Sequence, residues 1–310
     1  MSSILVAVDG PQAGEWLAAL REHAGGRELR VWPNDIGHPD DIESACVWNP
    51  PAGLLAGFPN LKAIINLGAG VDRLLSDPTL PKVALGRAAH GDLTMRVVGY
   101  VVLHVLVHHR RQRLYDAQQR ERIWRVHHQP AAGEVTVGVM GLGVIGAAAA
   151  NALVRLGFRV AGWSRTAKTL SGVETFHGQP GLDAFLGRSE ILVCLLPRTG
   201  GTEGILNLAL FRKLRRGAFL INAGRGPLQV EADIVAALDE GTLSGATLDV
   251  FAEEPLPKQS PLWAHPKVTI TPHNAGDIAP QVFAPLVMAQ IARFERGLPL
   301  DNSVDRDRGY

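Results

Sequence analysis

The sequence predicts an α/β protein with two doubly wound parallel sheets, of the Rossmann or flavodoxin-like kind, and a cleft between the two domains. Two observations carry this prediction. The chain has 310 residues, about twice an ordinary domain of ~150 residues. Short apolar runs alternate with helix-sized intervals along most of the chain, which is the pattern of buried parallel strands and their crossovers.

The strands of the first sheet are expected at ILVAV, LRVW, ACVW, KAIINL and KVALG, between Ile4 and about Gly86. Residues 92–125 have no Gly or Pro after Gly99, so we expect a long helix followed by an arm. A second sheet follows at VTVGVM, FRVAGW, ILVCLL, AFLINA, SGATLDV and KVTITP, and a last helix at about 280–296. These elements predict two domains, one of residues 1–98 with 275–310 and the other of residues 99–274.

Composition favours a small-molecule substrate. A net charge of +1 and 6% aromatic residues indicate neither a nucleic-acid nor a membrane-surface partner. The longest apolar stretch, residues 97–107, is well short of the ~18 residues of a membrane span. The N-terminus MSSILVAVDG has no basic region and is interpreted as a first strand, not a signal peptide. Cys46 and Cys194 each lie in an apolar, strand-like run, and nothing indicates a disulfide between them. A reducing cytoplasm is therefore the expected location.

A glycine motif in VTVGVMGLGVIG predicts the cofactor site. Gly141, Gly143 and Gly146 stand after an alternating strand and before an Ala-rich helix. In that context they provide a tight turn, backbone approach to a pyrophosphate and close helix packing, while the helix N-terminus faces the phosphates. The intervening Leu142, Val144 and Ile145 belong to the same predicted site. Residues 99–274 are therefore expected to form a dinucleotide-binding Rossmann domain, and residues 1–98 with 275–310 the substrate domain.

The end of the next strand indicates which dinucleotide binds. An NAD site places a carboxylate there for the ribose hydroxyls, whereas this chain carries no acid but a basic, hydroxylated turn. Hydroxyl, guanidinium and ammonium groups suit a 2′-phosphate. We therefore expect NADPH, with NADH weaker, at Trp163, Ser164, Arg165, Thr166 and Lys168.

Three strand ends of the second sheet carry the candidate catalytic residues Arg225, Glu254 and His273. Reduction of a carbonyl compound by a nicotinamide needs a proton donor for the carbonyl oxygen, and a cation can bind the carboxylate of an acidic substrate. Arg225 offers a planar fork, and His273 can deliver the proton. Glu254 is the candidate partner of the imidazole, fixing its tautomer and raising its pKa.

Taken together, GLGVIG, LLP-x-T, N-x-GRG, LDVF-x-EEPL and TPH, in this order, resemble the D-2-hydroxyacid dehydrogenases over nearly the whole chain. Within that family WSRT, VWNPP, LGAGVD, PLW-x-HP-x-VTITPH and VDR-x-RGY are most similar to bacterial glyoxylate/hydroxypyruvate reductases of the A type. The resemblance implies reduction of glyoxylate and hydroxypyruvate to glycolate and D-glycerate. It also implies that Arg225 binds substrate, His273 is the acid–base and Glu254 is its partner.

The resemblance further places Asp249 near the nicotinamide carboxamide. It assigns to the cofactor site, besides Arg225 and His273, the residues Leu195, Leu196, Pro197, Thr202, Ala223, Gly224 and Ala275. Substrate is expected at Arg225, at His273 and at a loop whose N–H groups can form an anion nest, which comprises Leu67, Gly68, Ala69 and Gly70. Trp48 is either a wall of the pocket or a core aromatic.

Two departures leave the substrate open. Relatives often carry a bulkier residue and then Ala where this chain has Ala223-Gly224, and an apolar residue where it has Asn274. A reductase of larger 2-keto acids, such as phenylpyruvate, and a catalytically silent NADPH-sensing protein therefore remain alternatives. Retention of Arg225, Glu254 and His273 argues against the sensor.

Two further patterns have simpler interpretations. His104 and His108 are four residues apart on a predicted helix, but no Glu accompanies them in a metalloprotease motif and hydride transfer needs no metal, so no metal site is predicted. The basic run RRQRLYDAQQRERIWR is typical of a solvated helix face. In the family it contributes to a homodimer interface, which would bring Trp124 to a neighbouring subunit.

Overall fold

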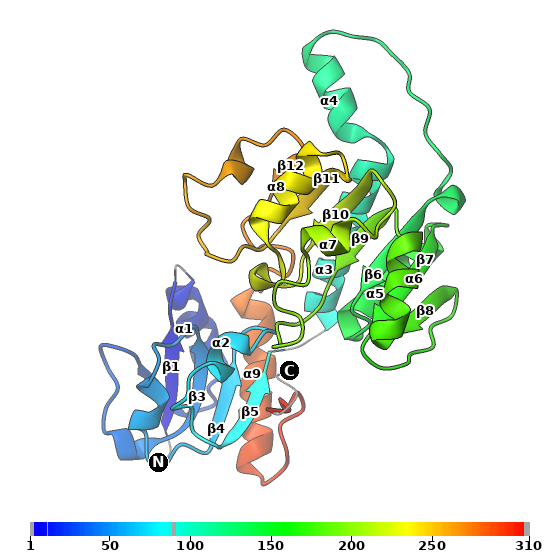
Figure 1. Cartoon of the computed structure of the whole chain (residues 1–310). Coiled ribbons are helices and arrows are strands. Elements are labelled where there is room, and N and C mark those ends of the chain that lie inside the picture. Colours follow the sequence, from blue (N-terminus) through cyan, green and yellow to red (C-terminus); the bar gives the residue numbers. More distant parts are fainter. Residues whose placement is uncertain (1–2, 11, 89–90, 307–310) are drawn as a thin grey trace. The chain divides into compact units, whose positions relative to one another are not determined.

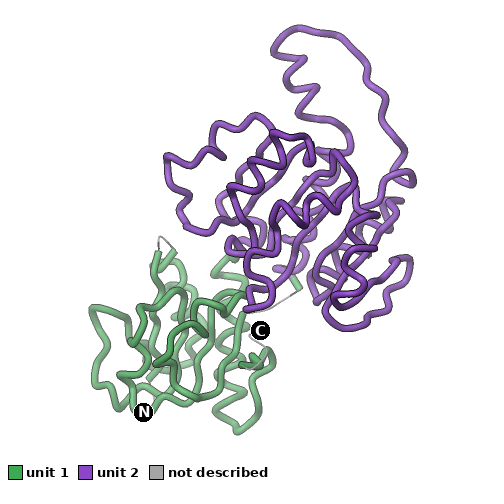
Figure 2. Tube along the Cα trace, viewed as in Figure 1, with its two compact units in different colours: residues 1–91, 278–310 green, residues 92–277 purple. Residues whose placement is uncertain are grey.

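The structure, a computed structural model, describes residues 3–10, 12–88 and 91–306. The chain divides into two compact units: unit 1 is residues 1–91 with 278–310, and unit 2 is residues 92–277 (Figure 2). The predicted boundaries at 98/99 and 274/275 lie a few residues from this division. The first of them falls inside helix α3 (Gly91–His109), whose Val97, Val98 and Val101 are buried in the core of unit 2.

Unit 1 contains a five-stranded parallel sheet with the order β2-β1-β3-β4-β5, the flavodoxin-like order. All five predicted strands are confirmed: β1 (Ser3–Val8), β2 (Glu28–Val31), β3 (Ile42–Trp48), β4 (Ala63–Asn66) and β5 (Ala84–Arg87).

The two faces of this sheet are buried by different segments. Side chains alternate between the faces of a strand, and Leu5 and Ala7 of β1 belong to a core cluster with Leu55, Phe58 and other apolar residues. Helices α1 (Ala13–Glu22) and α9 (Pro280–Glu295) contact each other, although they are far apart in sequence. The predicted last helix is present as α9, and it lies in unit 1. The same unit contains α2 (Asp72–Leu75) and the 3-10 turns η1 (Pro39–Asp41) and η2 (Leu54–Gly57).

Unit 2 contains a seven-stranded parallel sheet with the order β12-β11-β10-β9-β6-β7-β8 (Figure 1). Its strands are β6 (Thr136–Met140), β7 (Arg159–Ser164), β8 (Val173–His177), β9 (Ile191–Cys194), β10 (Ala218–Asn222), β11 (Leu243–Leu248) and β12 (Val268–Ile270). The six predicted strands are confirmed. Strand β8 was not predicted, because it is an edge strand without a fully buried residue and therefore lacks an apolar run.

Helices cover both faces of the second sheet, as doubly wound topology requires. Along β6, Val137 and Val139 join the core under α3 and α5 (Val144–Arg155), whereas Met140 joins the opposite core. That opposite core contains apolar residues of α6 (Gly178–Arg188), α7 (Leu208–Phe211) and α8 (Glu231–Asp239). The 3-10 turns of this unit are η3 (Ala132–Glu134), η4 (Gly226–Leu228) and η5 (Pro261–Trp263).

The predicted helix and arm of residues 92–125 form two helices, α3 and α4 (Gln112–Arg120). Arg111 between them has a left-handed backbone (φ 55°), which ends α3. The arm, residues 121–131, returns from α4 to β6 (Figure 1). In the described part of the chain, no helix combines the length and the apolar character needed to cross a membrane.

The order of strands locates the expected binding site of unit 2. From β6 the chain builds outward in one direction through β7 and β8, and in the other direction through β9 to β12. Ligands of such sheets bind beyond the carboxyl ends of the strands, where the order reverses. That position lies at the carboxyl ends of β6 and β9.

Two leucines at the carboxyl end of α5 provide a test of this packing. Leu153 is fully buried, whereas Leu156, at the end of the same helix, is 44% exposed. Leu153→Ala should lower the free energy of unfolding by about 2–5 kcal/mol, because it leaves a cavity in the core. Leu156→Ala should change it by less than about 0.5 kcal/mol. Urea unfolding of both variants measures the difference, and equal effects would contradict the packing of α5.

Candidate active site

The glycine motif forms the turn from β6 into α5. Gly141 has φ +107°, and a Cβ on it would lie 2.9 Å from the Leu195 carbonyl oxygen. A Cβ on Gly146 would lie only 1.7 Å from the Gly141 oxygen, so both positions exclude a side chain. At Gly143 a Cβ would meet nothing within 4 Å. The packing of the protein therefore gives no reason for glycine at 143, whereas close approach of a phosphate to the backbone does.

The residues between these glycines differ in exposure. Leu142 is buried, Ile145 is half-buried and Val144 is 81% exposed. The first N–H groups of α5 have no carbonyl partner within the helix, as at every helix start. Together with the open position at Gly143, they fit the pyrophosphate of a dinucleotide.

The turn after β7 divides into buried and exposed groups. The Trp163 side chain is buried and its Nε1 donates to the Gly178 carbonyl at 2.9 Å. The Ser164 hydroxyl donates to the Thr166 carbonyl at 2.8 Å and shapes the turn. Arg165, Thr166 and Lys168 are exposed. The cationic groups are thus on the surface beside the glycine turn, which is bonded to this strand end through the Gly141 N–H and the Trp163 carbonyl (2.8 Å).

The segment after β9 lies against the same turn. The Leu195 N–H donates to the Met140 carbonyl at 2.9 Å, Leu196 is buried and Pro197 is exposed. The Thr202 hydroxyl donates to the Pro197 carbonyl and accepts from the Thr199 N–H, both at 2.8 Å. Leu195 and Leu196 are therefore close to Gly141, and Thr202 fixes the conformation of the loop 197–202.

Arg225 stands in the loop after β10, and buried amides hold this loop. The Ala223 N–H donates to the Cys194 carbonyl at 3.2 Å, and the Gly224 N–H to Asn222 Oδ1 at 3.0 Å. Asn222 Nδ2 donates to Gln229 Oε1 at 2.8 Å, and Gln229 Nε2 donates to the Val250 carbonyl at 2.9 Å. The side chains of Asn222 and Gln229 thus connect the loop that carries Arg225 to the end of β11.

Direct backbone contact adds to this connection. A Cβ on Gly226 would lie 1.7 Å from the Phe251 carbonyl oxygen, so only glycine lets the two loops approach this closely. Phe251 in turn donates its N–H to Glu254 Oε1 at 2.9 Å. Arg225 itself is half-buried, and its Nη1 donates to the Gly224 carbonyl at 2.7 Å. These contacts therefore fix the loop of Arg225 and the loop of Glu254 relative to each other.

His273 and Glu254 form the predicted pair. His273 Nδ1 lies 2.8 Å from Glu254 Oε2. Burial raises the pKa of Glu254, but the hydrogen bond and charge of His273, the Phe251 N–H and the charge of Arg225 together lower it below its usual value. Glu254 is therefore an anion at neutral pH, and its bond to Nδ1 leaves Nε2 of the imidazole for a substrate.

Asp249, at the end of β11, is buried and bonded within the protein. Its Oδ1 accepts from the Thr271 hydroxyl at 2.6 Å and from the Asn274 N–H at 3.0 Å. Its Oδ2 accepts from the Ala275 N–H at 2.9 Å. Both oxygens thus bind the segment that contains His273, in addition to any role toward a nicotinamide.

The predicted substrate loop of unit 1 follows β4. Leu67 is buried and its N–H donates to the Val47 carbonyl at 2.8 Å, so this N–H belongs to the sheet and not to an anion site. Asn66 Nδ2 donates to the carbonyls of Gly68 (2.9 Å) and Gly70 (2.7 Å). These bonds hold the carbonyls on the side of Asn66, and Ala69 between the glycines is partly exposed.

Trp48, at the end of β3, packs on this loop. A Cβ on Gly68 would lie 2.0 Å from the Trp48 ring, and the ring is half-buried. It therefore acts as a wall of the loop and not as a residue of the deep core.

Four residues that hold the loops in place were not predicted: Asn66, Tyr100, Gln229 and Thr271. Thr271 stands in the TPH element, but only His273 of that element was given a role; the other three lie outside the glycine fingerprint and the catalytic motifs. The only available signal was an amide or hydroxyl beside a strand end, which is common in α/β proteins.

His104 and His108, the spaced histidines of α3, pack against aromatic rings. His104 lies 4.3 Å from the Tyr100 ring and His108 stacks 4.0 Å from the Phe219 ring, measured between ring centres. Burial lowers the pKa of both, that of His108 to about 4. Among the described residues, no group of three His, Cys, Asp or Glu side chains could hold a metal.

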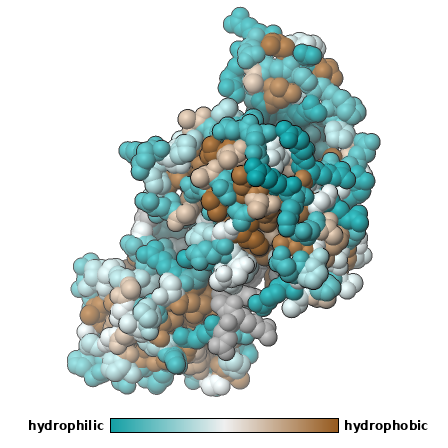
Figure 3. Space-filling model, viewed as in Figure 1, coloured by the Kyte–Doolittle hydropathy of each residue, from teal (hydrophilic) through white to brown (hydrophobic). Residues whose placement is uncertain are grey.

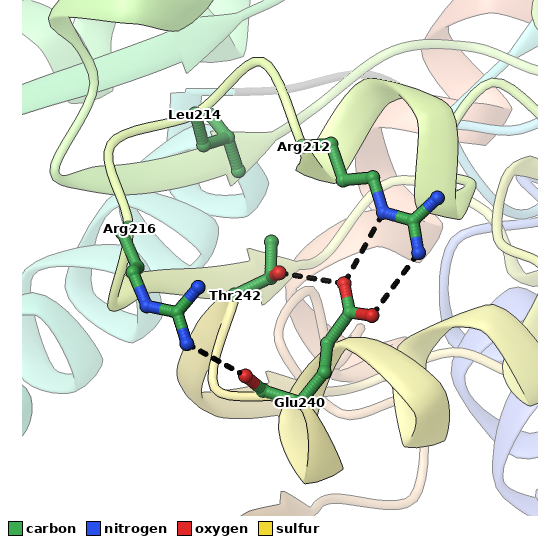
Figure 4. A pocket seen from close by; sticks show the side chains of 5 residues that line it. All are labelled: Arg212, Leu214, Arg216, Glu240 and Thr242. Atoms are coloured by element: carbon green, nitrogen blue, oxygen red, sulfur yellow. Dashed lines mark hydrogen bonds and ion pairs between the residues drawn. The ribbon is translucent and has the colours of Figure 1, made fainter.

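A surface cavity of about 320 Å³ lies elsewhere in unit 2, at the amino end of β11 (Figure 4). Its charged groups bind one another: Glu240 accepts from Arg212 at 3.1 Å and from the Thr242 hydroxyl at 2.7 Å, and Arg216 donates to the Glu240 carbonyl at 3.1 Å. The cavity contains none of the predicted site residues.

Comparison with known proteins gives consistent matches. A family model described as D-isomer specific 2-hydroxyacid dehydrogenase, NAD binding domain, matches residues 102–275. Glyoxylate/hydroxypyruvate reductase A of Yersinia enterocolitica is 40% identical over 305 residues, which cover 96% of this chain and 97% of that protein.

Solved structures agree over the whole chain. The NADPH-dependent glyoxylate/hydroxypyruvate reductase of Sinorhizobium meliloti, in complex with NADP and sulfate, is 44% identical, with a TM-score of 0.95 and 100% of both chains covered. A D-isomer specific 2-hydroxyacid dehydrogenase of Xanthobacter autotrophicus Py2, in complex with NADPH and MES, is 43% identical, with a TM-score of 0.94 and 100% of this chain and 99% of that chain covered. The site described above thus stands in a chain that belongs to the D-isomer specific 2-hydroxyacid dehydrogenase family.

Proposed function

We propose that this chain reduces small 2-keto acids, glyoxylate and hydroxypyruvate, to glycolate and D-glycerate with NADPH. The observation that carries the proposal is the His273–Glu254 pair at 2.8 Å, in which the loop of Glu254 is tied to the loop of Arg225. The relatives named above, a glyoxylate/hydroxypyruvate reductase A and an NADPH-dependent reductase of the same substrates, support this choice.

The proposed mechanism assigns one task to each side chain. The bound nicotinamide would supply hydride to the ketone carbon. His273 would donate a proton from Nε2 to the ketone oxygen, so that the C=O becomes a CH–OH. Glu254 would hold the imidazole through Nδ1 and stabilise its charged form. Arg225 would bind the carboxylate and polarise the ketone.

In the same proposal unit 2 is the dinucleotide-binding domain and unit 1 the substrate domain. The N–H groups of residues 68–70 would bind the carboxylate of the substrate as an anion nest, with Trp48 as the adjacent wall. The remaining cofactor residues are those around Gly141, at the end of β7 and in the loops after β9, β10 and β11. Asp249 would face the carboxamide while it holds the His273 segment.

Arg165 and Lys168 are proposed to select NADPH. Replacing both by alanine should lower kcat/KM with NADPH by on the order of 10- to 100-fold, because charged hydrogen bonds to the 2′-phosphate are lost, and change kcat/KM with NADH little. Arg188→Ala, an exposed arginine paired with Glu174, is the control. Initial rates with each nucleotide measure the preference. Equal kcat/KM values for NADPH and NADH in the wild type would contradict it.

The catalytic assignment makes a separate prediction. His273→Ala should lower kcat by about 10² to 10⁴-fold and leave the Kd of NADPH nearly unchanged, because the lost interaction forms in the transition state. Arg225→Ala should lower kcat and raise KM. Steady-state rates and nucleotide titration separate the two effects, and wild-type turnover in His273→Ala would remove His273 from this role.

A panel of keto acids distinguishes the remaining functions. Faster turnover of phenylpyruvate than of hydroxypyruvate would indicate a reductase of larger substrates. Tight NADPH binding with no turnover of any keto acid would indicate a sensor.

We also propose that the chain forms a homodimer through the arm. Trp124 is 99% exposed, and Val126 and Ile123 beside it are exposed too; Figure 3 shows apolar side chains on this part of the surface. The arm is nevertheless ordered by hydrogen bonds, since His127 donates its N–H to the Tyr115 hydroxyl and Gln129 donates to the Arg110 carbonyl. An ordered segment with exposed apolar residues is typical of an interface.

Sedimentation tests this interface. The wild type should sediment at twice the chain mass of 33.3 kDa, and Trp124→Ala should weaken association by at least about tenfold, as expected for an interface tryptophan. Trp263→Ala, an exposed tryptophan outside the arm, should have no effect. A monomeric wild type at micromolar concentration would overturn the proposal.

A cytoplasmic location is proposed on the basis of the thiols. Cys46 and Cys194 are free and buried, and burial raises the pKa of each to about 12. Such unpaired thiols are typical of a reducing compartment, where NADPH is also the usual reductant.

A further inference from the structure

The backbone of His273 has a conformation that a histidine rarely adopts. Its φ is +54°, in the left-handed region that is unfavourable for side chains with a Cβ. Its N–H donates to the Asp249 carbonyl at 2.8 Å and to the Thr271 carbonyl at 3.1 Å. A residue keeps such a conformation only where its surroundings impose it.

The next two peptide groups are bonded to a buried carboxylate. Asp249 accepts from the N–H groups of Asn274 and Ala275, one on each oxygen. These bonds fix the chain directly after His273, and with them the direction in which the imidazole leaves the backbone. The position of His273 therefore depends on the orientation of the Asp249 carboxylate.

Two hydroxyl groups determine that orientation. The Thr271 hydroxyl lies 2.6 Å from Asp249 Oδ1 and 2.7 Å from the Tyr100 hydroxyl. The Thr271 hydroxyl donates its one hydrogen to Asp249 Oδ1, so Thr271 accepts the hydrogen of the Tyr100 hydroxyl. The hydrogen bonds thus run in one direction, from α3 through Thr271 to the carboxylate.

Tyr100 is held firmly enough to act as the first donor. It is half-buried on α3, with its ring 4.3 Å from that of His104. Burial raises the pKa of the Tyr100 phenol above its usual value, so its hydroxyl keeps the hydrogen at neutral pH.

We propose that Thr271 and Tyr100 are positioning residues, which orient Asp249 and thereby hold His273 in its left-handed conformation for proton transfer. This inference rests on the proposed function of His273. Neither hydroxyl is required to touch substrate or cofactor.

The first test measures the backbone and needs no turnover. In Thr271→Val, amide hydrogen exchange of a peptide spanning residues 272–277 should become faster by on the order of tenfold, because a charged hydrogen bond to Asp249 is lost. Tyr100→Phe should give a smaller increase. Thr271→Ser keeps the hydroxyl and should restore wild-type exchange. Unchanged exchange in Thr271→Val would overturn the inference.

The second test measures the reaction. Thr271→Val should lower kcat by on the order of 10- to 100-fold, as a displaced catalytic group does, with the Kd of NADPH nearly unchanged. The isotope effect on kcat with NADPH deuterated at the transferred position should be larger than in the wild type, because a displaced proton donor slows the chemical step relative to product release. A loss of folded protein alone would lower kcat without changing the isotope effect, and that result would contradict the inference.

A matched control is available in the cavity of Figure 4. The Thr242 hydroxyl also donates to a carboxylate, that of Glu240, at 2.7 Å, and Thr242 is buried. Thr242→Val therefore removes the same kind of bond at the amino end of β11, and it should leave exchange at 272–277 and the isotope effect unchanged. If Thr242→Val reproduced the effects of Thr271→Val, the positioning role would be refuted.

Failure of the inference and failure of the proposed function give different results. If the wild type turns over no 2-keto acid, the proposed function fails, and the exchange experiment still decides whether Thr271 and Tyr100 hold the turn. If Thr271→Val weakens NADPH binding but leaves exchange unchanged, Asp249 acts through the nucleotide and the positioning role is wrong.

Discussion

The buried carboxylate of Asp249 is the interaction on which the candidate active site depends. A carboxylate in a protein interior is costly unless it is fully hydrogen-bonded, and Asp249 accepts from one hydroxyl and two backbone N–H groups. All three donors come from residues 271–275, the segment that contains His273. These hydrogen bonds to Asp249 therefore hold the chain beyond β12 in place.

The other loops of the site are joined by backbone contact. Gly226 lies against the Phe251 carbonyl, and Gly141 lies against the Leu195 carbonyl. Contacts of this kind leave no room for a Cβ, and they connect the carboxyl ends of neighbouring strands without intervening side chains. The parallel sheet thus acts as a rigid base, since each strand end of unit 2 brings one loop to the same edge.

Much of this arrangement could be predicted from the sequence, because the signals are local. Apolar runs fixed the positions of eleven strands, and β8 was missed because it is half exposed at the edge of its sheet. His273 and Glu254 were predicted as a pair from chemistry and order in the chain, and the structure places them 2.8 Å apart. The role of Tyr100 could not be predicted, because its partner Thr271 is far away in sequence. The role of Gln229 could not be predicted, because it binds a backbone carbonyl, which no residue type marks. The break at Arg111 was missed because no Gly or Pro marks it.

The position of α9 has a consequence for the order of folding during synthesis. Unit 2 is one continuous segment, so its sheet and both of its cores are complete once residue 277 has left the ribosome. Unit 1 is interrupted, and α9 supplies the buried Phe283, Val287 and Ile291. The first strands of unit 1 therefore keep an apolar face exposed to solvent until α9 has been synthesised. Domains that are continuous in sequence fold as units as they emerge, so we expect the second unit of this chain to fold before the first.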